Sequence, residues 1–334
     1  MKLAIVCQRY DPSSVSGRFI ARSLPALERA GVEVTLVTRE AQGWGARRVL
    51  RVDPFHVGRL WSERSFARAA REAWLREGFD LVQSHEPIPG CHVYRPGGAE
   101  HPPALVKETI EHPRLRAVLC PSKRMHDELR RAFRVAPEKL HVVYSGVDLE
   151  HFHPRERERL RGAARAELGC RPRDTVFLMA AASELGTAIQ AARDEHLWLA
   201  VAAEPPKSSG FPERVRFVGR RDDLRPLYAA ADCLLDLGHD AFPDSVLEAL
   251  AMGLPAILSA RNGAAEVIEP GVNGWLWQPD DPGSLSRLLA AADAAARAGS
   301  MGAAARASAE QYEAGRMVER LSNLYRTLTS STAG

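Results

Sequence analysis

The feature that most constrains the fold is an alternation of short apolar runs with helical patterns, which occurs twice along the 334 residues. The first series opens with an apolar run at Leu3 to Cys7. A helical stretch from Arg18 to Ala30 follows and ends at Gly31, and a second apolar run covers Val32 to Thr38. A strand, a helix and a strand in this order form a βαβ unit, whose strands are parallel. We therefore predict α/β architecture built on parallel sheets.

The same alternation predicts the remaining elements. In the first half, the expected strands are Arg48 to Val52, Leu81 to Ser84, Ala117 to Cys120 and Leu140 to Tyr144, with helices near 63–77 and 122–134. In the second half, they are Thr175 to Ala181, Leu197 to Ala202, Val215 to Val218, Cys233 to Asp236 and Pro255 to Leu258, with helices near 222–231, 245–252 and 282–297. An Ala-rich stretch from Leu285 to Tyr325 continues at helical spacing, because alanine is the best helix former.

A charged segment with Pro154 and Pro172 separates the two series and has the composition of a linker with one exposed helix. The chain is long enough for two cores of about 150 residues each. We therefore predict an N-terminal domain over 1–147, a linker over 148–173, a C-terminal domain over 174–312, and a terminal helix and tail over 313–334.

Composition disfavours several other classes of protein. No run approaches the roughly 20 apolar residues that span a bilayer, and Met1-Lys2-Leu3 opens the chain without a charged leader before an apolar core. We therefore expect a cytoplasmic protein. The five cysteines lie far apart and form no Cys-x-x-Cys pair, so buried reduced thiols are expected in place of a zinc site or a disulfide framework.

The net charge of +3 is unevenly divided. Residues 1–150 carry 24 Lys and Arg against 18 Asp and Glu, and the remainder carries 21 against 24. A basic half can attract anionic lipid or a phosphorylated acceptor, so peripheral contact with the inner membrane is one interpretation. A solvated surface is the other, because the arginines are scattered. Nothing in the chain matches a nucleic-acid-binding motif.

Two acidic residues follow a predicted strand of the second half, at the end where ligands bind in open parallel sheets. Asp240 and Glu248 are separated by seven residues, with Pro243 in the turn and Ser245 as the expected helix N-cap. The helix N-terminus at 244–246 suits a diphosphate, and a carboxylate can accept hydrogen bonds from hydroxyls. The alternative is that both acids only cap the helix and complement its dipole.

The surrounding sequence extends this pattern. Its segments are Val215 to Gly219, Leu227 to Asp232, Asp240 to Pro255, Asn262 to Ile268, Gly271 to Trp275, and Asp281. In order and spacing they resemble the donor half of family 4 glycosyltransferases, also called group 1. This signal is much stronger than a lone Gly-rich match.

The first half resembles the same family over shorter stretches. Asp80 to Arg95 is similar to the corresponding stretch of the subfamily that includes lipopolysaccharide core glucosyltransferases, and Val143 to Asp148 to the family's interdomain passage. His85 is expected at the carboxyl end of a strand, where it can donate to a sugar hydroxyl or a phosphate. A structural histidine is the alternative. Gly17 and Arg18, which open the first helix, form the expected acceptor or phosphate loop.

The resemblance implies a GT-B fold, with two Rossmann-like domains and an interdomain cleft. It implies metal-independent, retaining transfer of a hexose from a UDP-sugar or another nucleoside diphosphate sugar to a hydroxyl of a glycan or glycolipid, in lipopolysaccharide core or another envelope glycan. Glu248 would hold the ribose and Asp240 the donor sugar, with Asp240 and His85 as catalytic residues. The other donor-binding residues are Gly219, Arg220, Phe242, Asp244, Ser245 and Val246. Neither a metal nor a separate cofactor is expected.

Two departures from the family pattern leave other functions open. Asp240 stands where the family usually has Glu, and residues 180–187 lack the Arg and Lys-Gly pair that neutralise the donor diphosphate. Lys207, Arg220 and Arg261 are the available substitutes. Loss of such charges weakens transition-state stabilisation, which favours a sugar-nucleotide-binding homologue with impaired turnover. A sugar-nucleotide epimerase on the same fold is a third possibility. A nicotinamide dehydrogenase is disfavoured, because no Gly-x-Gly-x-x-Gly follows the first strand.

Overall fold

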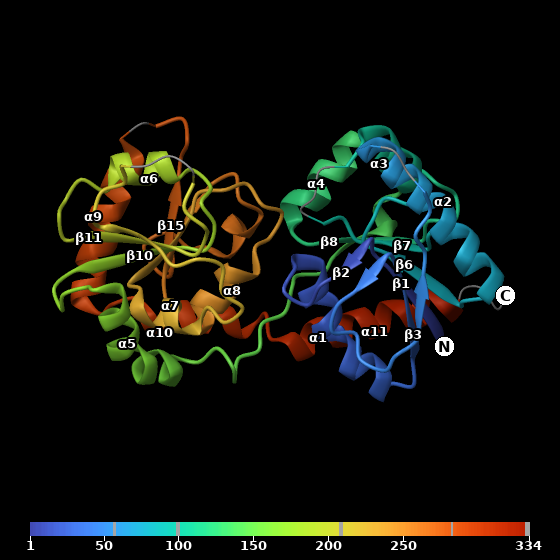
Figure 1. Cartoon of the computed structure of the whole chain (residues 1–334), viewed down its shortest axis with the longest axis horizontal. Helices are drawn as coiled ribbons and strands as arrows, with labels where there is room; N and C mark the ends of the chain where they lie inside the picture. Colours follow the sequence, from blue (N-terminus) through green and yellow to red (C-terminus); the bar gives the residue numbers. More distant parts are fainter. Residues whose placement is uncertain (56–57, 98–100, 207–209, 282, 331–334) are drawn as a thin grey trace. The chain divides into compact units, whose positions relative to one another are not determined.

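The computed structural model describes residues 1–55, 58–97, 101–206, 210–281 and 283–330. The chain divides into two compact units, each built on one parallel sheet (Figure 1). The first unit contains Met1–Gly146 and Ala314–Gly334, and the second contains Val147–Glu313. The predicted α/β class with two Rossmann-like domains is therefore confirmed. Residues 148–173, predicted as a linker, fall within the second unit, and the C-terminal helix belongs to the first.

The first unit has a seven-stranded sheet of order β5-β3-β1-β6-β7-β8-β9. The strands of this unit are β1 (Lys2–Val6), β2 (Arg9–Tyr10), β3 (Glu33–Thr38), β4 (Glu40–Ala41), β5 (Val49–Arg51), β6 (Leu81–Ser84), β7 (Val93–Tyr94), β8 (Ala117–Cys120) and β9 (Leu140–Val142). Its helices are α1 (Val15–Arg29), α2 (Arg59–Glu77), α3 (Pro103–Ile110), α4 (Lys123–Ala132) and α11 (Ala314–Ser330). Strands β2 and β4 form a separate two-stranded sheet.

Side chains on the two faces of this sheet enter two different cores, because successive residues of a strand point to opposite sides. Leu3 and Ile5 of β1 pack with α1 and α11, whereas Ala4 and Val6 pack with α2, α3 and α4. Figure 1 shows the sheet between these two helical layers. Both faces of the sheet are covered, which is why its strands are apolar runs without a polar side.

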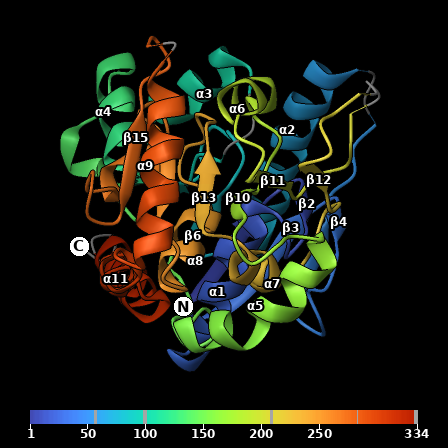
Figure 2. The same cartoon turned by 90° about the vertical axis from the view of Figure 1, so that its left-hand side faces the viewer.

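The second unit has a six-stranded parallel sheet of order β12-β11-β10-β13-β14-β15. Its strands are β10 (Thr175–Met179), β11 (Leu197–Val201), β12 (Val215–Phe217), β13 (Cys233–Asp236), β14 (Ala256–Ser259) and β15 (Gly274–Trp277). Its helices are α5 (Pro154–Leu168), α6 (Leu185–Ala191), α7 (Arg225–Ala230), α8 (Asp244–Ala251), α9 (Ser284–Ala298) and α10 (Gly302–Glu310). One face packs on α6 and α9 (Figure 2).

The Ala-rich stretch from Leu285 to Tyr325 is helical, as its spacing predicts, and is divided into three helices. It forms α9, α10 and α11, and α9 ends at Gly299, whose φ of 63° stops a helix in the left-handed region. The described residues between β11 and β12, 202–206 and 210–214, contain no helix.

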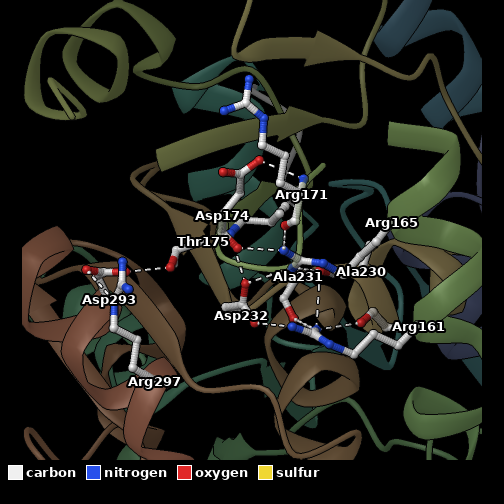
Figure 3. Close-up of polar contacts among 12 residues, drawn as sticks. Arg161, Arg165, Arg171, Asp174, Thr175, Ala230, Ala231, Asp232, Asp293 and Arg297 are labelled. Carbon is white, nitrogen blue, oxygen red and sulfur yellow. Dashed lines mark hydrogen bonds and ion pairs between the residues drawn. The ribbon is translucent and has the colours of Figure 1, made fainter. Parts of the chain in front are cut away.

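Three arginines of α5 bind the carboxyl end of the short helix α7. Figure 3 shows two of them, Arg161 and Arg165, together with Asp232. Arg157, Arg161 and Arg165 are four residues apart and so lie on one face of α5. Their guanidinium groups donate to the last carbonyls of α7, which have no partner within that helix, and Arg161 and Arg165 also pair with Asp232. The cluster of Arg157, Arg161, Arg165 and Asp232, hereafter the arginine clamp, fixes α7 to α5.

The chain passes between the units twice, and Gly146 stands at one of these passages. A Cβ added to Gly146 would lie 2.4 Å from the Cα of Ala314. The carbonyl of Gly146 also accepts a hydrogen bond from Arg22 of α1 at 2.7 Å. Glycine is therefore required here by the close approach of backbone to backbone.

We expect Gly146→Ala to lower the free energy of unfolding of the first unit by about 1–3 kcal/mol, as overpacking typically does. The control is Gly162→Ala on the exposed side of α5, where an added Cβ meets nothing within 4 Å. That change should stabilise the protein by up to about 1 kcal/mol, because alanine is the better helix former. Urea denaturation measures both, and equal effects of the two substitutions would contradict the packing argument.

Candidate functional site

The carboxyl edge of the second sheet carries the predicted pair of acids. Strand β13 ends at Asp236, the exposed Asp240 follows in the loop, and α8 begins at Asp244. The backbone carbonyl of Asp240 accepts a hydrogen bond from the N–H of Gly263 at 2.8 Å. A Cβ on Gly263 would lie 1.6 Å from the carbonyl oxygen of Ala241, so the glycine lets this loop rest on the segment after β14.

Glu248 lies one turn inside α8, as predicted, and only 6% of it is exposed. The hydroxyl of Tyr228 on α7 donates to its Oε2 at 3.0 Å. A buried carboxylate needs such donors to remain stable. Sequence reasoning did not find this partner, although Tyr228 lies within a segment that resembles the family.

The amino end of α8 differs from the prediction in one detail. Pro243 is the N-cap and Ser245 is the second helical residue, so the prediction of Ser245 as N-cap is wrong. The N–H of Val246 donates to the Pro243 carbonyl at 3.3 Å. Asp244 and Ser245 are buried. The side chains of Phe242 and Val246 are also buried, so these two residues can offer only backbone groups to a ligand.

Asp236 is a titratable group of this edge that sequence reasoning did not single out. Its pKa is raised to about 6, chiefly by burial and then by the nearby charge of Asp240, while hydrogen bonds from Gly238 and Asn262 act in the opposite direction. The Gly238 N–H and the Asn262 amide both donate to Oδ1, at 3.1 and 3.2 Å. The folded state therefore binds this proton more tightly than the unfolded chain does.

Stability should consequently fall as the pH rises from about 4 to above 6, because Asp236 must then ionise in a half-buried site beside Asp240. Asp236→Asn keeps an oxygen acceptor but cannot ionise. We expect it to raise the free energy of unfolding at pH 7.5 by about 1–3 kcal/mol, and to make no difference near pH 4. Denaturation of both proteins across this pH range measures the effect. The exposed Asp222→Asn is the control, and a gain in Asp236→Asn that did not depend on pH would contradict the explanation.

Among the described residues, few cationic side chains at the carboxyl edge of the second sheet are available to a diphosphate. Where the family has Arg and Lys after β10, Glu184 has a left-handed backbone with φ of 56° and accepts a hydrogen bond from Thr187 at 3.0 Å. Arg261 is held by Asp280 through two contacts of 2.9 Å. Arg220, which follows Gly219 after β12, is exposed, and its guanidinium forms no ion pair or hydrogen bond with any described residue. Lys207 lies outside the described residues.

His85 lies at the carboxyl edge of the first sheet, directly after β6, as predicted. Its backbone N–H donates to the carbonyl of Val6 at 2.8 Å, and 2% of the residue is exposed. Its Nε2 lies 3.0 Å from Nε2 of the Gln83 amide. Burial, and then the charge of Arg95, hold the pKa of His85 well below its usual value, so the imidazole is neutral.

Gly17 and Arg18 lie in the first turn of α1 on the same edge of that sheet. Ser14 is the N-cap and accepts from the Gly17 N–H at 3.0 Å. A Cβ on Gly17 would lie 1.7 Å from the Asp11 carbonyl, so the packing of the preceding loop already requires glycine here. Arg18 donates to the Ser13 carbonyl at 2.9 Å. Both residues therefore shape the loop itself.

Three further predictions concern metal ions, cysteines and membrane-spanning segments. The described residues include no group of three or more His, Cys, Asp or Glu that could hold a metal ion. All five cysteines are free thiols; Cys170 is half-buried and the other four are buried, as predicted for them. Within the described part of the chain, no helix is long and apolar enough to cross a membrane.

The architecture is that of GT-B proteins. Residues 1–334 resemble the crystal structure of WaaG, a glycosyltransferase involved in lipopolysaccharide biosynthesis, with a TM-score of 0.85, 18% identity and coverage of 97% of this chain and 99% of that one. They also resemble HepE of Anabaena in complex with UDP-glucose, with a TM-score of 0.75, 17% identity and coverage of 98% and 100%. At these identities the likeness establishes the fold.

The family follows from the sequence. Residues 16–151 match the model for "Glycosyltransferase Family 4", and residues 175–292 match that for "Glycosyl transferases group 1". This chain belongs to the family 4, or group 1, glycosyltransferases. A probable transglycosylase of Burkholderia thailandensis is 32% identical over 219 residues, which is 63% of this chain and 59% of that protein. The matched part thus spans less than two thirds of that relative.

Proposed function

We propose that this protein is a retaining glycosyltransferase that moves a hexose from a nucleoside diphosphate sugar to a hydroxyl of a glycan or glycolipid. The observation that carries the proposal is Glu248, a buried carboxylate held by Tyr228 at the start of α8, within the region that matches the group 1 model. A carboxylate in this position can accept hydrogen bonds from both ribose hydroxyls. The adjacent helix N-terminus suits a diphosphate.

Asp240 and His85 are the proposed catalytic residues. Asp240 is exposed at the sheet edge, where its carboxylate can accept from hydroxyls of the donor sugar. In a retaining transfer of this kind, the leaving phosphate can take the acceptor proton on the same face. The protein then contributes positioning and electrostatic stabilisation, and no side chain need act as a nucleophile.

Lipopolysaccharide core or another envelope glycan is the proposed acceptor class. It is supported by the first-half motif from Asp80 to Arg95 and by the structural likeness to WaaG. The basic charge of residues 1–150 is compatible with a phosphorylated or membrane-bound acceptor at the inner membrane, reached from the cytoplasm.

The test is the heat of binding of UDP, ADP and GDP and of their hexose derivatives, followed by transfer from the tightest donor to a lipopolysaccharide core acceptor. Selective binding of one base, with hexose transfer that retains the anomeric configuration, is the expected result. Binding of the sugar nucleotide without transfer to any acceptor would favour the second candidate, a homologue with impaired turnover. That candidate is supported by Glu184 and the absence of the two cations at 180–187.

Arg220 is the proposed replacement for these cations. We expect Arg220→Ala to weaken the binding of nucleoside diphosphates about 10-fold, because a charge-assisted hydrogen bond to phosphate is worth about 1.5 kcal/mol or more. Its neighbour Arg221 is the matched control, since it is already held by Glu167 at 3.1 Å and by the Val218 carbonyl at 2.9 Å. Equal losses in Arg220→Ala and Arg221→Ala would remove Arg220 from the site.

A further inference from the structure

Gln83 is a buried amide on an apolar face of the first sheet. Leu81, Gln83 and His85 alternate along β6 and the residue after it, so they face the same side. On that side Leu81 packs with α1 and α11. Gln83 is 1% exposed, and a buried amide must find hydrogen-bond partners within the protein. Its partners connect the C-terminal helix to His85.

The hydroxyl of Tyr325 on α11 donates to Oε1 of Gln83, and the amide Nε2 of Gln83 faces Nε2 of His85 at 3.0 Å. An amide nitrogen only donates, so Nε2 of His85 must accept. In a neutral imidazole the proton then resides on Nδ1. The orientation of the amide in the structure gives the Tyr325 hydroxyl an acceptor and Nε2 of His85 a donor.

Nδ1 of His85 is buried and has no hydrogen-bond partner among the described residues. Its ring lies 5.9 Å from the ring of Phe19, over which the guanidinium of Arg95 stacks at 4.0 Å. A buried N–H without an acceptor is costly and rare in native structures, so its retention calls for an explanation. An oxygen atom of the bound substrate, acting as the missing acceptor, would explain why this N–H is retained.

We propose that Tyr325 and Gln83 are positioning residues that hold His85 in the Nδ1–H tautomer, ready to donate a hydrogen bond to an oxygen of the bound sugar. The contact with sugar rests on the proposed function, whereas the tautomer is a property of the first unit alone. The last helix of the chain thereby controls the chemistry of a residue that lies 240 positions before Tyr325 in the sequence.

The tautomer can be measured directly by nitrogen NMR of protein labelled at histidine. Wild type at pH 7 should show His85 protonated at Nδ1 and not at Nε2. Tyr325→Phe frees the amide to rotate and should give a mixture of tautomers. Gln83→Met removes the donor to Nε2 and should move the proton to Nε2. Wild-type His85 protonated at Nε2, or a spectrum unchanged in Tyr325→Phe, would overturn the proposal whether or not the protein transfers sugar.

Transfer kinetics provide the second measurement. Tyr325→Phe and Gln83→Met should lower kcat about 10-fold, with the Kd of the free nucleoside diphosphate unchanged. Tyr10→Phe is the control, because Tyr10 is a buried tyrosine of the same core and should leave both constants unchanged. Altered tautomers with unaltered kcat would exclude a role of Nδ1–H in transfer. If wild type transfers no sugar, the proposed function fails, and the NMR result still decides the arrangement of protons.

Discussion

Glu248→Ala should weaken the binding of nucleoside diphosphates about 100-fold. The Glu248 carboxylate is buried and already oriented by Tyr228, so it can accept hydrogen bonds from ribose hydroxyls without first losing freedom. Two charge-assisted hydrogen bonds contribute about 3 kcal/mol, which corresponds to a factor of about 100 or more in Kd. Calorimetric titration of wild type and variant with the preferred nucleoside diphosphate measures the loss.

A nucleoside diphosphate that lacks the ribose 2′-hydroxyl provides a control for the role of Glu248. A 2′-deoxynucleoside diphosphate should bind wild type more weakly than the ribose form does, and Glu248→Ala should bind the two forms equally. Tyr228→Phe keeps the carboxylate but removes its hydrogen-bond donor, so a smaller loss of about 5- to 10-fold is expected. If the variant is folded and still prefers the ribose form as wild type does, Glu248 does not hold the ribose.

Much of the fold could be predicted because its strands are short apolar runs between turn residues. β6, β8 and β13 begin and end where the sequence pattern placed them. β7 was missed, because a two-residue strand has no periodicity and exists only through pairing with β6 and β8. The helical pattern near the C-terminus predicted helix but not its partner, because amphipathic spacing does not say that α11 packs on the first sheet.

The candidate site, like the fold, has a part that the sequence predicted and a part that it did not. The position of Glu248 one turn inside α8 followed from local spacing. Its partner Tyr228 is 20 residues away, and Tyr325 is 242 residues from Gln83, so only the folded chain brings these pairs together. The raised pKa of Asp236 likewise depends on burial and on Asp240 together, which no single motif shows. Sequence patterns located the strand and helix ends near which Glu248 and His85 lie, but not the contacts that each makes within its own unit.

The largest loss of stability should come from Asp232→Ala in the arginine clamp. Asp232 is 8% exposed, and its carboxylate pairs with Arg161 and Arg165 and accepts from the N–H of Val176 at 2.9 Å (Figure 3). Its removal leaves two guanidinium groups without their carboxylate and a buried N–H without an acceptor. Breaking a buried charge pair in this way costs about 3–5 kcal/mol, so the free energy of unfolding of the second unit should fall by that amount.

Asp232→Asn and Asp223→Ala are the controls for this substitution. Asn can still accept from Val176, so it should recover part of the stability, whereas Asp223 pairs with Arg225 near the surface and its loss should cost less than about 1 kcal/mol. Urea unfolding followed by signals from each unit separates the two transitions. A loss in Asp232→Ala no larger than in Asp223→Ala would show that the arginine clamp adds little stability.

The arginine clamp also bears on binding, because it holds α7 and α7 carries the Tyr228 that orients Glu248. Asp232→Ala should therefore weaken nucleoside diphosphate binding a few-fold even where the protein is fully folded, by loosening the partner of the ribose-binding carboxylate. Glu248→Ala should remove this sensitivity, so that the double variant binds no more weakly than Glu248→Ala alone. Additive losses in the double variant would instead mean that the clamp and the ribose site act independently.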